Sequence, residues 1–373
     1  MFTGKIQPQK ITEAREARGY NMSELAGVVG VTRQAISRYE QGQSIPSEKV
    51  IEKISNTLDF PVEFFFVDSY REHIYGTTFF RSYATSTSKI RMAVDRKCNW
   101  IGHIYDYIQQ YLNLPKLSLP VTDLLTNRNE FTMEDIEILA NMLRDHWNLG
   151  RGPIPNLMHV IEKNGIVIAR MSVGEKKVDA CHKCIDGRPF IFLGNDKISC
   201  CRDRFSLSHE LGHILMHSYL SSEELCDKKI LNRIEKEANL FAGAFLMPKE
   251  SFIEEVVSTR ANSLIALKSR WKASIACIIQ RCKALELFDE EQCVRLNRML
   301  VQKNWKRHEP LDDDITLEQP QIIRASLDMI VKNGLDSVQG IQTLYYFPLK
   351  DLCQLCNVSA NFFNRSGFDL QLK

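Results

Sequence analysis

The sequence lacks the features that would place it in a membrane or outside the cell. No apolar stretch approaches the roughly 20 residues that cross a bilayer. The first residues, Met1 to Lys5, do not begin an apolar leader, so no secretory signal is expected. The 11 cysteines are an odd number on a chain without an export signal, which favours free thiols. We therefore expect a reduced, cytoplasmic protein with no membrane partner.

The sequence also lacks a large charge of either sign. It has 48 Lys and Arg against 46 Asp and Glu, a formal net charge of +2, so any contact with nucleic acid requires a local basic patch. The 44% of hydrophobic and 25% of charged residues are typical of globular proteins and argue against wholesale disorder or a fibrous repeat. At roughly 150 residues per domain, the 373 residues suffice for two or three domains.

Apolar spacing and turn signals divide the chain into four parts. Residues 1–68 are expected to form an all-α bundle of short helices, and residues 69–98, rich in Ser, Thr and Tyr, a linker. Residues 99–260 combine helical patterns with short strand-like runs. Residues 261–373 are mostly helical and form a candidate docking region for a substrate or partner. The expected fold class is mainly α with a small β-sheet, an α+β architecture.

Two short apolar runs are expected to be strands. Residues 166–169 (IVIA) form the first, and residues 188–193 (RPFIFL), which follow the turn signal Asp186-Gly187, form the second. An exposed sheet edge can pair with an extended peptide through its backbone. We therefore expect the run from Pro189 to Leu193 to be an edge strand that binds an extended substrate.

The strongest chemical pattern is the segment 205–213, FSLSHELGH. Residues four apart lie on one face of a helix, so His209 and His213 can offer two imidazole nitrogens to a single metal ion. Glu210 lies about 100° round the helix, where it suits a general base acting on water beside the ion. Gly212 lets another backbone approach closely. The alternative is a helix with two ordinary histidines.

A second helical segment supplies a third ligand. A catalytic zinc takes three protein ligands and leaves one position for water. Glu235 follows 22 residues after His213 and shares a helix face with Asn239, so Glu235 is the expected ligand and Asn239 is expected to hold a histidine ring. Glu237 is the competing ligand, although it points about 200° away and fits a solvated face better. His217 either closes the end of the first helix or reaches the rim of the site.

These helices and the segments around them resemble the ImmA/IrrE family of bacterial metallopeptidases, a gluzincin-like group. The resemblance begins near Phe80-Arg81, is dense across 140–144 and 147–154, and ends with Phe245-Leu246-Met247-Pro248. It covers somewhat under half of the chain. It implies a zincin-like metallopeptidase domain within residues 99–260.

The resemblance also implies a site and a reaction. The zinc ligands of the family fall on His209, His213 and Glu235, and its catalytic glutamate falls on Glu210; Ser208 stands where such proteins often have alanine. The activity implied is hydrolysis of a peptide bond in a protein. In this family the substrate is often a repressor, whose cleavage switches on stress, phage or mobile-element genes.

Residues 11–67 carry a second pattern. Met22 begins a short helix, Gly30 allows a turn, and Thr32 caps a second helix that runs to about Gln41. The apolar residues expected to interlock the two helices are Leu25, Val28, Val31 and Ile36. The pattern resembles the phage-repressor (Xre) type of helix-turn-helix domain.

That resemblance implies DNA contacts. The N-terminal part of the second helix would enter the major groove of double-stranded DNA, with Arg33, Gln34 and Ser37 nearest to base edges and Arg38 on a phosphate. Residues 1–68 contain eight Lys or Arg against nine Asp or Glu, which is weak electrostatics for a DNA-binding domain; the basic stretch 69–97 would compensate. We expect a homodimer, because one half-site gives little affinity. The alternative is a bundle of the same fold that mediates protein contacts.

Two CxxC pairs, Cys181–Cys184 and Cys353–Cys356, lack correctly spaced partners. Unpaired thiols are the expected state, and a structural zinc or a redox switch is the alternative.

The sequence as a whole favours a zinc-dependent endopeptidase coupled to a DNA-binding module that regulates gene expression. Two alternatives stay open. One is a DNA-binding transcription regulator whose metal site is sensory or non-catalytic, and the other is a component of a toxin–antitoxin or phage-defence system.

Overall fold

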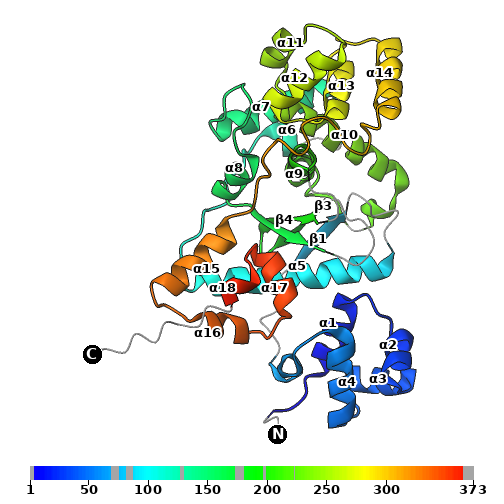
Figure 1. The fold of residues 1–373 in the computed structure, drawn as a ribbon, viewed down its shortest axis with the longest axis vertical. Helices are drawn as coiled ribbons and strands as arrows, with labels where there is room; N and C mark the ends of the chain where they lie inside the picture. Colours follow the sequence, from blue (N-terminus) through cyan, green and yellow to red (C-terminus); the bar gives the residue numbers. More distant parts are fainter. Residues whose placement is uncertain are drawn as a thin grey trace.

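The computed structural model describes residues 4–68, 75–80, 87–126, 130–172, 180–195, 199–221 and 223–363. The chain is mainly helical with one four-stranded sheet, so the predicted fold class is confirmed. The N-terminal helices lie at one end of the molecule, the sheet near its middle and helices α11 to α14 at the other end (Figure 1). In the described residues, no helix is long and apolar enough to span a membrane.

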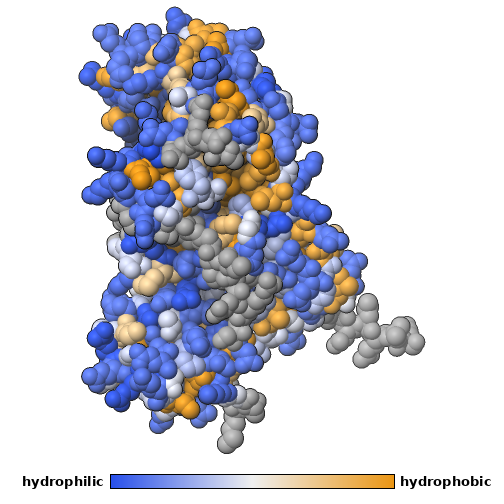
Figure 2. Space-filling model, turned by 180° about the vertical axis from the view of Figure 1, so that it is seen from behind, coloured by the Kyte–Doolittle hydropathy of each residue, from blue (hydrophilic) through white to orange (hydrophobic). Residues whose placement is uncertain are grey.

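The N-terminal bundle contains α1 (Pro8–Ala17), α2 (Met22–Val29), α3 (Arg33–Glu40), α4 (Glu48–Leu58) and the short 3-10 helix η1 (Val62–Phe66). Thr32 caps α3 as predicted, because its hydroxyl accepts a hydrogen bond from the backbone N–H of Ala35 at 3.1 Å. Gly30 ends α2 at a φ of 81°, a conformation that favours glycine. Seen from behind, the surface of this bundle is largely hydrophilic (Figure 2).

One core residue of the bundle was predicted wrongly. Val28 is 62% exposed, whereas its neighbour Val29 is buried. The buried face of α2 runs through Leu25, Ala26 and Val29, and residues adjacent in a helix are turned by about 100°. Val28 therefore faces solvent. Ile36 is buried as expected.

The bundle packs against α5 (Ser88–Gln109) and the C-terminal helix α17 (Leu349–Cys356). The rings of Trp100 on α5 and Phe347 just before α17 stack with centroids 4.9 Å apart, and Phe60 of the bundle meets Trp100 edge-on. Asp351 of α17 forms ion pairs with Arg18 of α1 at 2.8 Å and with Lys97 of α5 at 2.7 Å. Helix α5 thus joins the bundle to the rest of the chain.

The sheet contains β1 (Tyr75–Phe80), β2 (Val167–Met171), β3 (Ala180–Ile185) and β4 (Arg188–Gly194), in the order β1-β3-β4-β2. Strand β3 is antiparallel to β1 and β4, and β2 is parallel to β4. The two predicted strands, β2 and β4, are confirmed. Part of the segment that the sequence assigns to a linker forms β1 and the first half of α5.

The expected edge strand is wrong. Residues 188–194 form β4, which is hydrogen-bonded to β3 on one side and to β2 on the other. Its backbone groups are therefore already paired and cannot receive an extended substrate.

The two faces of β3 contact helices on opposite sides of the sheet. Helix α5 lies on one side of the sheet and α9 (Cys200–Met216) on the other (Figure 1). Lys183 reaches α5, where its ammonium donates to Asp95 and, at 3.0 Å, to Asn99. Because side chains alternate along a strand, His182 points to the opposite face, toward α9.

The remaining helices form two groups. The first is buried in a second core with α9 and comprises α7 (Met133–His146), α8 (Leu157–Lys163), α10 (Lys228–Leu246), α11 (Lys249–Glu255), α12 (Ala261–Trp271), α13 (Ile275–Ala284) and α14 (Glu290–Gln302). The second lies near α5 and comprises α15 (Ile322–Lys332), α16 (Val338–Thr343), α17 and α18 (Ala360–Phe363). The short elements α6 (Asp123–Thr126) and η2 (Glu224–Cys226) precede α7 and α10. The region 261–373 is thus divided between two cores.

Candidate metal centre

Helices α9 and α10 pack closely enough to bring three polar side chains together. A Cβ atom on Gly212 would lie 3.1 Å from the ring of Phe241 and 3.3 Å from the Cα of Ala238, so only glycine permits this approach without a shift. His209 and His213 come from α9 and Glu235 comes from α10. In the part of the chain that the structure describes, these three residues are the group that could hold a metal ion.

The ligand atoms lie close to the spacing that zinc requires. The Nε2 atoms of His209 and His213 lie 3.0 Å apart, and oxygens of Glu235 lie 3.5 Å and 3.4 Å from them. Zinc bonds nitrogen and oxygen at about 2.0–2.2 Å, so the ligand atoms of a tetrahedral site are separated by about 3.3–3.6 Å. Two imidazoles and one carboxylate also match the donor set of a catalytic zinc site. The residues present therefore fit this ion.

The protonation states support the same donor set. Burial by itself would raise the pKa of Glu235, but hydrogen bonds and charge from His209 and His213 outweigh it and lower that pKa to about 2. Burial lowers the pKa of His209. An ionised carboxylate and a neutral imidazole are the forms that bind metal ions.

Asn239 fixes the orientation of the first histidine. Its side-chain oxygen lies 3.1 Å from Nδ1 of His209, so that nitrogen carries the proton and Nε2 faces the site. Asn239 stands one helical turn after Glu235 on α10, the position expected from the sequence.

A buried relay fixes the second histidine and corrects the interpretation of Glu237. Nδ1 of His213 lies 3.0 Å from Nδ1 of His217, and Nε2 of His217 lies 2.8 Å from Glu237. Glu237 is only 5% exposed and also accepts a hydrogen bond from the backbone N–H of Phe131 at 3.3 Å. The solvated face expected for Glu237 is therefore wrong, because the segment before α7 covers that side of α10. His217 lies within this relay and not at the rim.

Glu210 is buried beside a histidine that the sequence analysis did not single out. Its Oε2 lies 2.7 Å from Nδ1 of His182 on β3, and both side chains are almost fully buried. Burial lowers the pKa of His182 to about 3, which keeps the ring neutral. His182 lies between the two cysteines of the first CxxC pair. Only the pairing of β3 with β4 reveals that this position faces α9.

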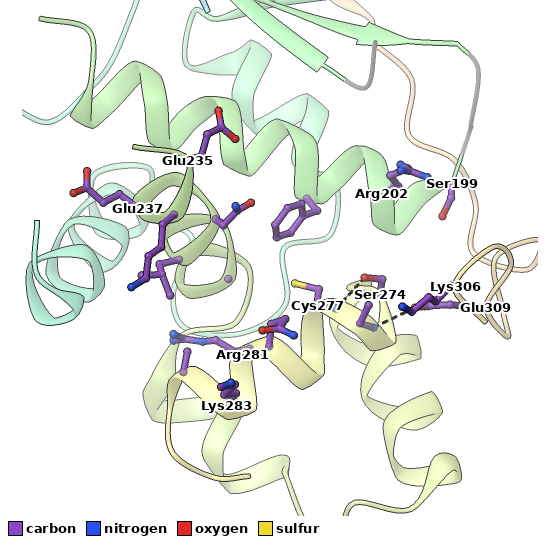
Figure 3. Close-up of a pocket in the computed structure, with 18 of the residues that line it drawn as sticks. Ser199, Arg202, Glu235, Glu237, Ser274, Cys277, Arg281, Lys283, Lys306 and Glu309 are labelled. Atoms are coloured by element: carbon purple, nitrogen blue, oxygen red, sulfur yellow. Dashed lines mark hydrogen bonds between the residues drawn. The ribbon is translucent and has the colours of Figure 1, made fainter. Parts of the chain in front are cut away.

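A cleft of about 1540 Å³ opens beside Glu235, the one of the three ligands that lines it. The helix faces that carry the ligands continue into it, through Arg202 and Phe205 on α9 and through Asn239 and Gly243 on α10. Helix α13 and the segment 305–313 form the opposite wall (Figure 3). Glu235 is 26% exposed, so the site is open from this side.

The predicted DNA-contacting residues lie on α3. Arg33, Gln34 and Arg38 are exposed and Ser37 is half-buried. Other cations of the bundle are engaged elsewhere: Arg15 pairs with Glu40, and Arg18 with Asp351. The cysteines of the CxxC pairs are free thiols in β3 and α17. A hydrogen bond with Cys98, together with burial, raises the pKa of Cys181, and burial raises the pKa of the other three.

Comparison with known proteins identifies two parts of the chain. Residues 161–283 match the family model of the IrrE N-terminal-like domain, peptidase M78, and residues 11–65 match that of a helix-turn-helix domain. Similar proteins include candidate HTH-type transcriptional regulatory proteins of Pyrococcus horikoshii (36% identical over 61 residues) and Methanocaldococcus jannaschii (43% over 61 residues). Each match covers 16% of this chain and 19% of the relative.

A third relative is the uncharacterized SPbeta prophage-derived HTH-type transcriptional regulator YonR of Bacillus subtilis. It is 32% identical over 56 residues, which are 15% of this chain and 52% of that protein. The chain therefore spans only about a fifth to a half of the length of these relatives. The matched part of this chain is its N-terminal bundle. The chain carries a helix-turn-helix domain at residues 11–65 and an IrrE N-terminal-like domain of the peptidase M78 family at residues 161–283.

Proposed function

We propose that this chain is a zinc-dependent endopeptidase coupled to a DNA-binding module, and that it regulates gene expression by cleaving a protein such as a repressor. The observation that carries the proposal is the convergence of His209, His213 and Glu235 within bonding reach of one ion, with Glu210 on the same helix. The match of residues 161–283 to a peptidase family supports it.

The proposed roles follow from the contacts. His209, His213 and Glu235 would hold zinc, which supplies the Lewis acidity that makes water deprotonate near neutral pH. Glu210 takes the proton from the attacking water and delivers it to the leaving amine. His182 holds the Glu210 carboxylate at 2.7 Å. Asn239 and the relay of His217 and Glu237 orient the two ligand rings.

The DNA-binding part of the proposal rests on α3. Arg33 and Gln34 stand exposed in the first turn of this helix, where donors can reach base edges in the major groove. The helix-turn-helix match and the regulator names of the relatives support this role. We further propose that the chain acts as a cytoplasmic homodimer on double-stranded DNA.

The test of the peptidase is a substitution that keeps the metal site. Glu210→Gln removes the base but none of the ligands, so the variant is expected to retain about one zinc per chain and to lose cleavage. Protein termini in cells that produce the wild type are compared with those in cells that produce Glu210→Gln. Glu254→Gln, an exposed residue on α11, is the matched control and should cleave normally. Cleavage retained by Glu210→Gln would exclude the proposed mechanism.

A regulator with a non-catalytic metal site is the second candidate. The observation that favours it is the burial of Glu210, whose carboxylate is 1% exposed and bound to His182. On this alternative, gene expression in Glu210→Gln cells matches the wild type, whereas His209→Ala, which removes a ligand, alters it. The peptidase proposal requires both variants to alter expression.

A further inference from the structure

The two central strands of the sheet, β3 and β4, have no free edge for a substrate. Strand β4 is paired on both sides, and β1 pairs with the outer edge of β3, where Phe79 stands opposite His182. Direct strand addition to β3, the strand that contacts Glu210, is therefore blocked by β1. The open approach is the cleft along α9 and α10, which reaches the metal centre at Glu235.

The cleft has an apolar middle. Phe205 and Leu240 face it from α9 and α10, half-buried, and Ala276 and Cys277 face it from α13. Such a surface suits an apolar side chain of a bound peptide. It lies next to Glu235 and Asn239, so this side chain would stand close to the reacting bond.

The end of the cleft farther from Glu235 is basic. Arg202 in the first turn of α9 lies there with Lys306 of the opposite wall (Figure 3), and Arg307 follows Lys306. All three side chains are exposed. Among the described residues, no ion pair or hydrogen bond engages the side chain of Lys306 or of Arg307.

The acidic residues near this end are outnumbered by the basic ones. Glu309 and Asp312 form ion pairs with the buried Lys268 at 2.8 Å and 2.6 Å, and Asp313 pairs with His308 at 3.0 Å. Four cations, Arg202, Lys268, Lys306 and Arg307, thus stand against three carboxylates, so this end of the cleft carries a formal excess of one positive charge. An acidic group on the ligand complements it.

The spacing fixes where that acidic group would stand. Arg202 precedes His209 by seven residues, which is about 10 Å along a helix at 1.5 Å per residue. An extended peptide advances about 3.3 Å per residue, so 10 Å corresponds to about three residues.

We propose that this cleft is the substrate groove of the peptidase, and that it selects an extended segment with an apolar residue at the scissile bond and an acidic residue about three positions away. The inference rests on the proposed function, because it places the scissile bond at the candidate zinc site. Phe205 and Leu240 receive the apolar side chain. Arg202, Lys306 and Arg307 receive the acidic one.

Peptide binding to the full-length Glu210→Gln protein, loaded with zinc, tests the proposal without relying on catalysis. The probes are fluorescein-labelled twelve-residue peptides with a central leucine and with Asp, Asn or Lys three positions to either side of it. Fluorescence anisotropy should show that an Asp peptide binds about tenfold tighter than its Lys counterpart, and that the difference shrinks with added salt. Equal affinity of all peptides would overturn the proposal.

Charge reversal tests whether the preference for the Asp peptide comes from the cleft. Lys306→Glu combined with Arg307→Glu should lower the affinity for the Asp peptide about tenfold and raise that for the Lys peptide. The control is Arg295→Glu with Arg298→Glu, exposed residues on α14 outside the cleft that change the net charge equally. If the control changes the Asp-to-Lys ratio as much as the cleft variant does, the groove is not the source of the preference.

The outcomes for groove and peptidase are separable. If the wild type cleaves the peptides but shows no preference for Asp, the groove inference fails and the peptidase proposal stands. If the Asp peptide binds selectively but is never cleaved, the groove stands as a docking surface and the peptidase proposal fails.

Discussion

Nδ1 of His182 lies 2.7 Å from Oε2 of Glu210, although the two residues come from different layers of the fold. Strand β3 presents the ring to α9, and burial keeps the ring neutral, so it can donate a hydrogen bond to the carboxylate. A carboxylate held in this way has one preferred orientation. His182 is therefore a positioning residue for the proposed base.

Substitution of His182 should affect turnover more than binding. In His182→Phe the hydrogen bond to Glu210 is lost, and we expect kcat to fall about 10- to 100-fold with KM and zinc content nearly unchanged. Steady-state kinetics on a cleaved peptide and metal analysis check this. Cys184→Ser, on the same face of the same strand, is the control. An unchanged kcat in His182→Phe would show that His182 serves only packing.

The two glutamates of α10 should differ in their effect on the metal. Glu235→Gln removes an anionic ligand, so the bound zinc should fall well below one per chain. Glu237→Gln weakens the relay through His217 to His213, and we expect zinc to dissociate about 10- to 100-fold more readily. Competition with a chelator measures both. Equal losses in the two variants would contradict the assignment of Glu235 as the ligand.

The close contact of α9 and α10 should make Gly212 intolerant of a side chain. Gly212→Ala places a Cβ 3.3 Å from the Cα of Ala238, which cannot move without shifting α10. We expect the free energy of unfolding to fall by about 1–3 kcal/mol and zinc affinity to fall with it. Gly27→Ala is the control, because nothing lies within 4 Å of its new Cβ. A variant as stable as the wild type would mean that the helices pack less tightly than described.

Helical periodicity explains why the candidate ligands could be predicted. Residues four apart share a helix face, so His209 with His213 and Glu235 with Asn239 follow from spacing alone. Periodicity gives the angle between two side chains but not which element covers each face. Periodicity therefore predicts a solvent-exposed Glu237, whereas in the structure the segment at Phe131 covers this side chain.

The sheet was harder to predict for a different reason. Strand β3 reads ACHKCI, with polar residues on both faces, and so lacks the alternation that marks a half-buried strand. Its partner β1 lies about a hundred residues earlier in the chain, and no local signal reports such a pairing. Because neither β1 nor β3 is predicted from the sequence, β4 is expected to be an edge strand. The role of His182 was hidden for the same reason.

Stability should depend on pH through Glu162. This carboxylate accepts hydrogen bonds from the backbone N–H groups of Gln321 and Ile322 at the start of α15, but burial outweighs them and raises its pKa to about 7. The folded state therefore binds the proton more tightly than the unfolded state. The stabilisation is complete below the ordinary pKa of 4.5 and is lost as the pH rises to about 7.

Denaturant unfolding at several pH values measures this effect. A pKa shift of this size lowers the free energy of unfolding by on the order of 3 kcal/mol between pH 4.5 and 7. Glu162→Gln carries no titrating proton, so its free energy of unfolding should vary less over that window. Glu254→Gln should keep the dependence of the wild type. The same slope in wild type and Glu162→Gln would assign the effect to other groups.

The DNA-binding role of α3 should be separable from the metal centre. Arg33→Ala combined with Gln34→Ala removes the two exposed donors in the first turn of α3, and each such contact contributes about 1–3 kcal/mol. We expect at least about a thirtyfold loss of affinity for a duplex that the wild-type chain selects from a random library, with peptide cleavage unchanged. Arg38→Ala should weaken binding to all duplexes alike and reduce the salt dependence, because a phosphate contact carries no sequence information. Arg298→Ala, on α14, is the control for lost charge. If Arg33→Ala with Gln34→Ala binds the selected duplex like the wild type, α3 does not read the bases, and the bundle serves protein contacts instead.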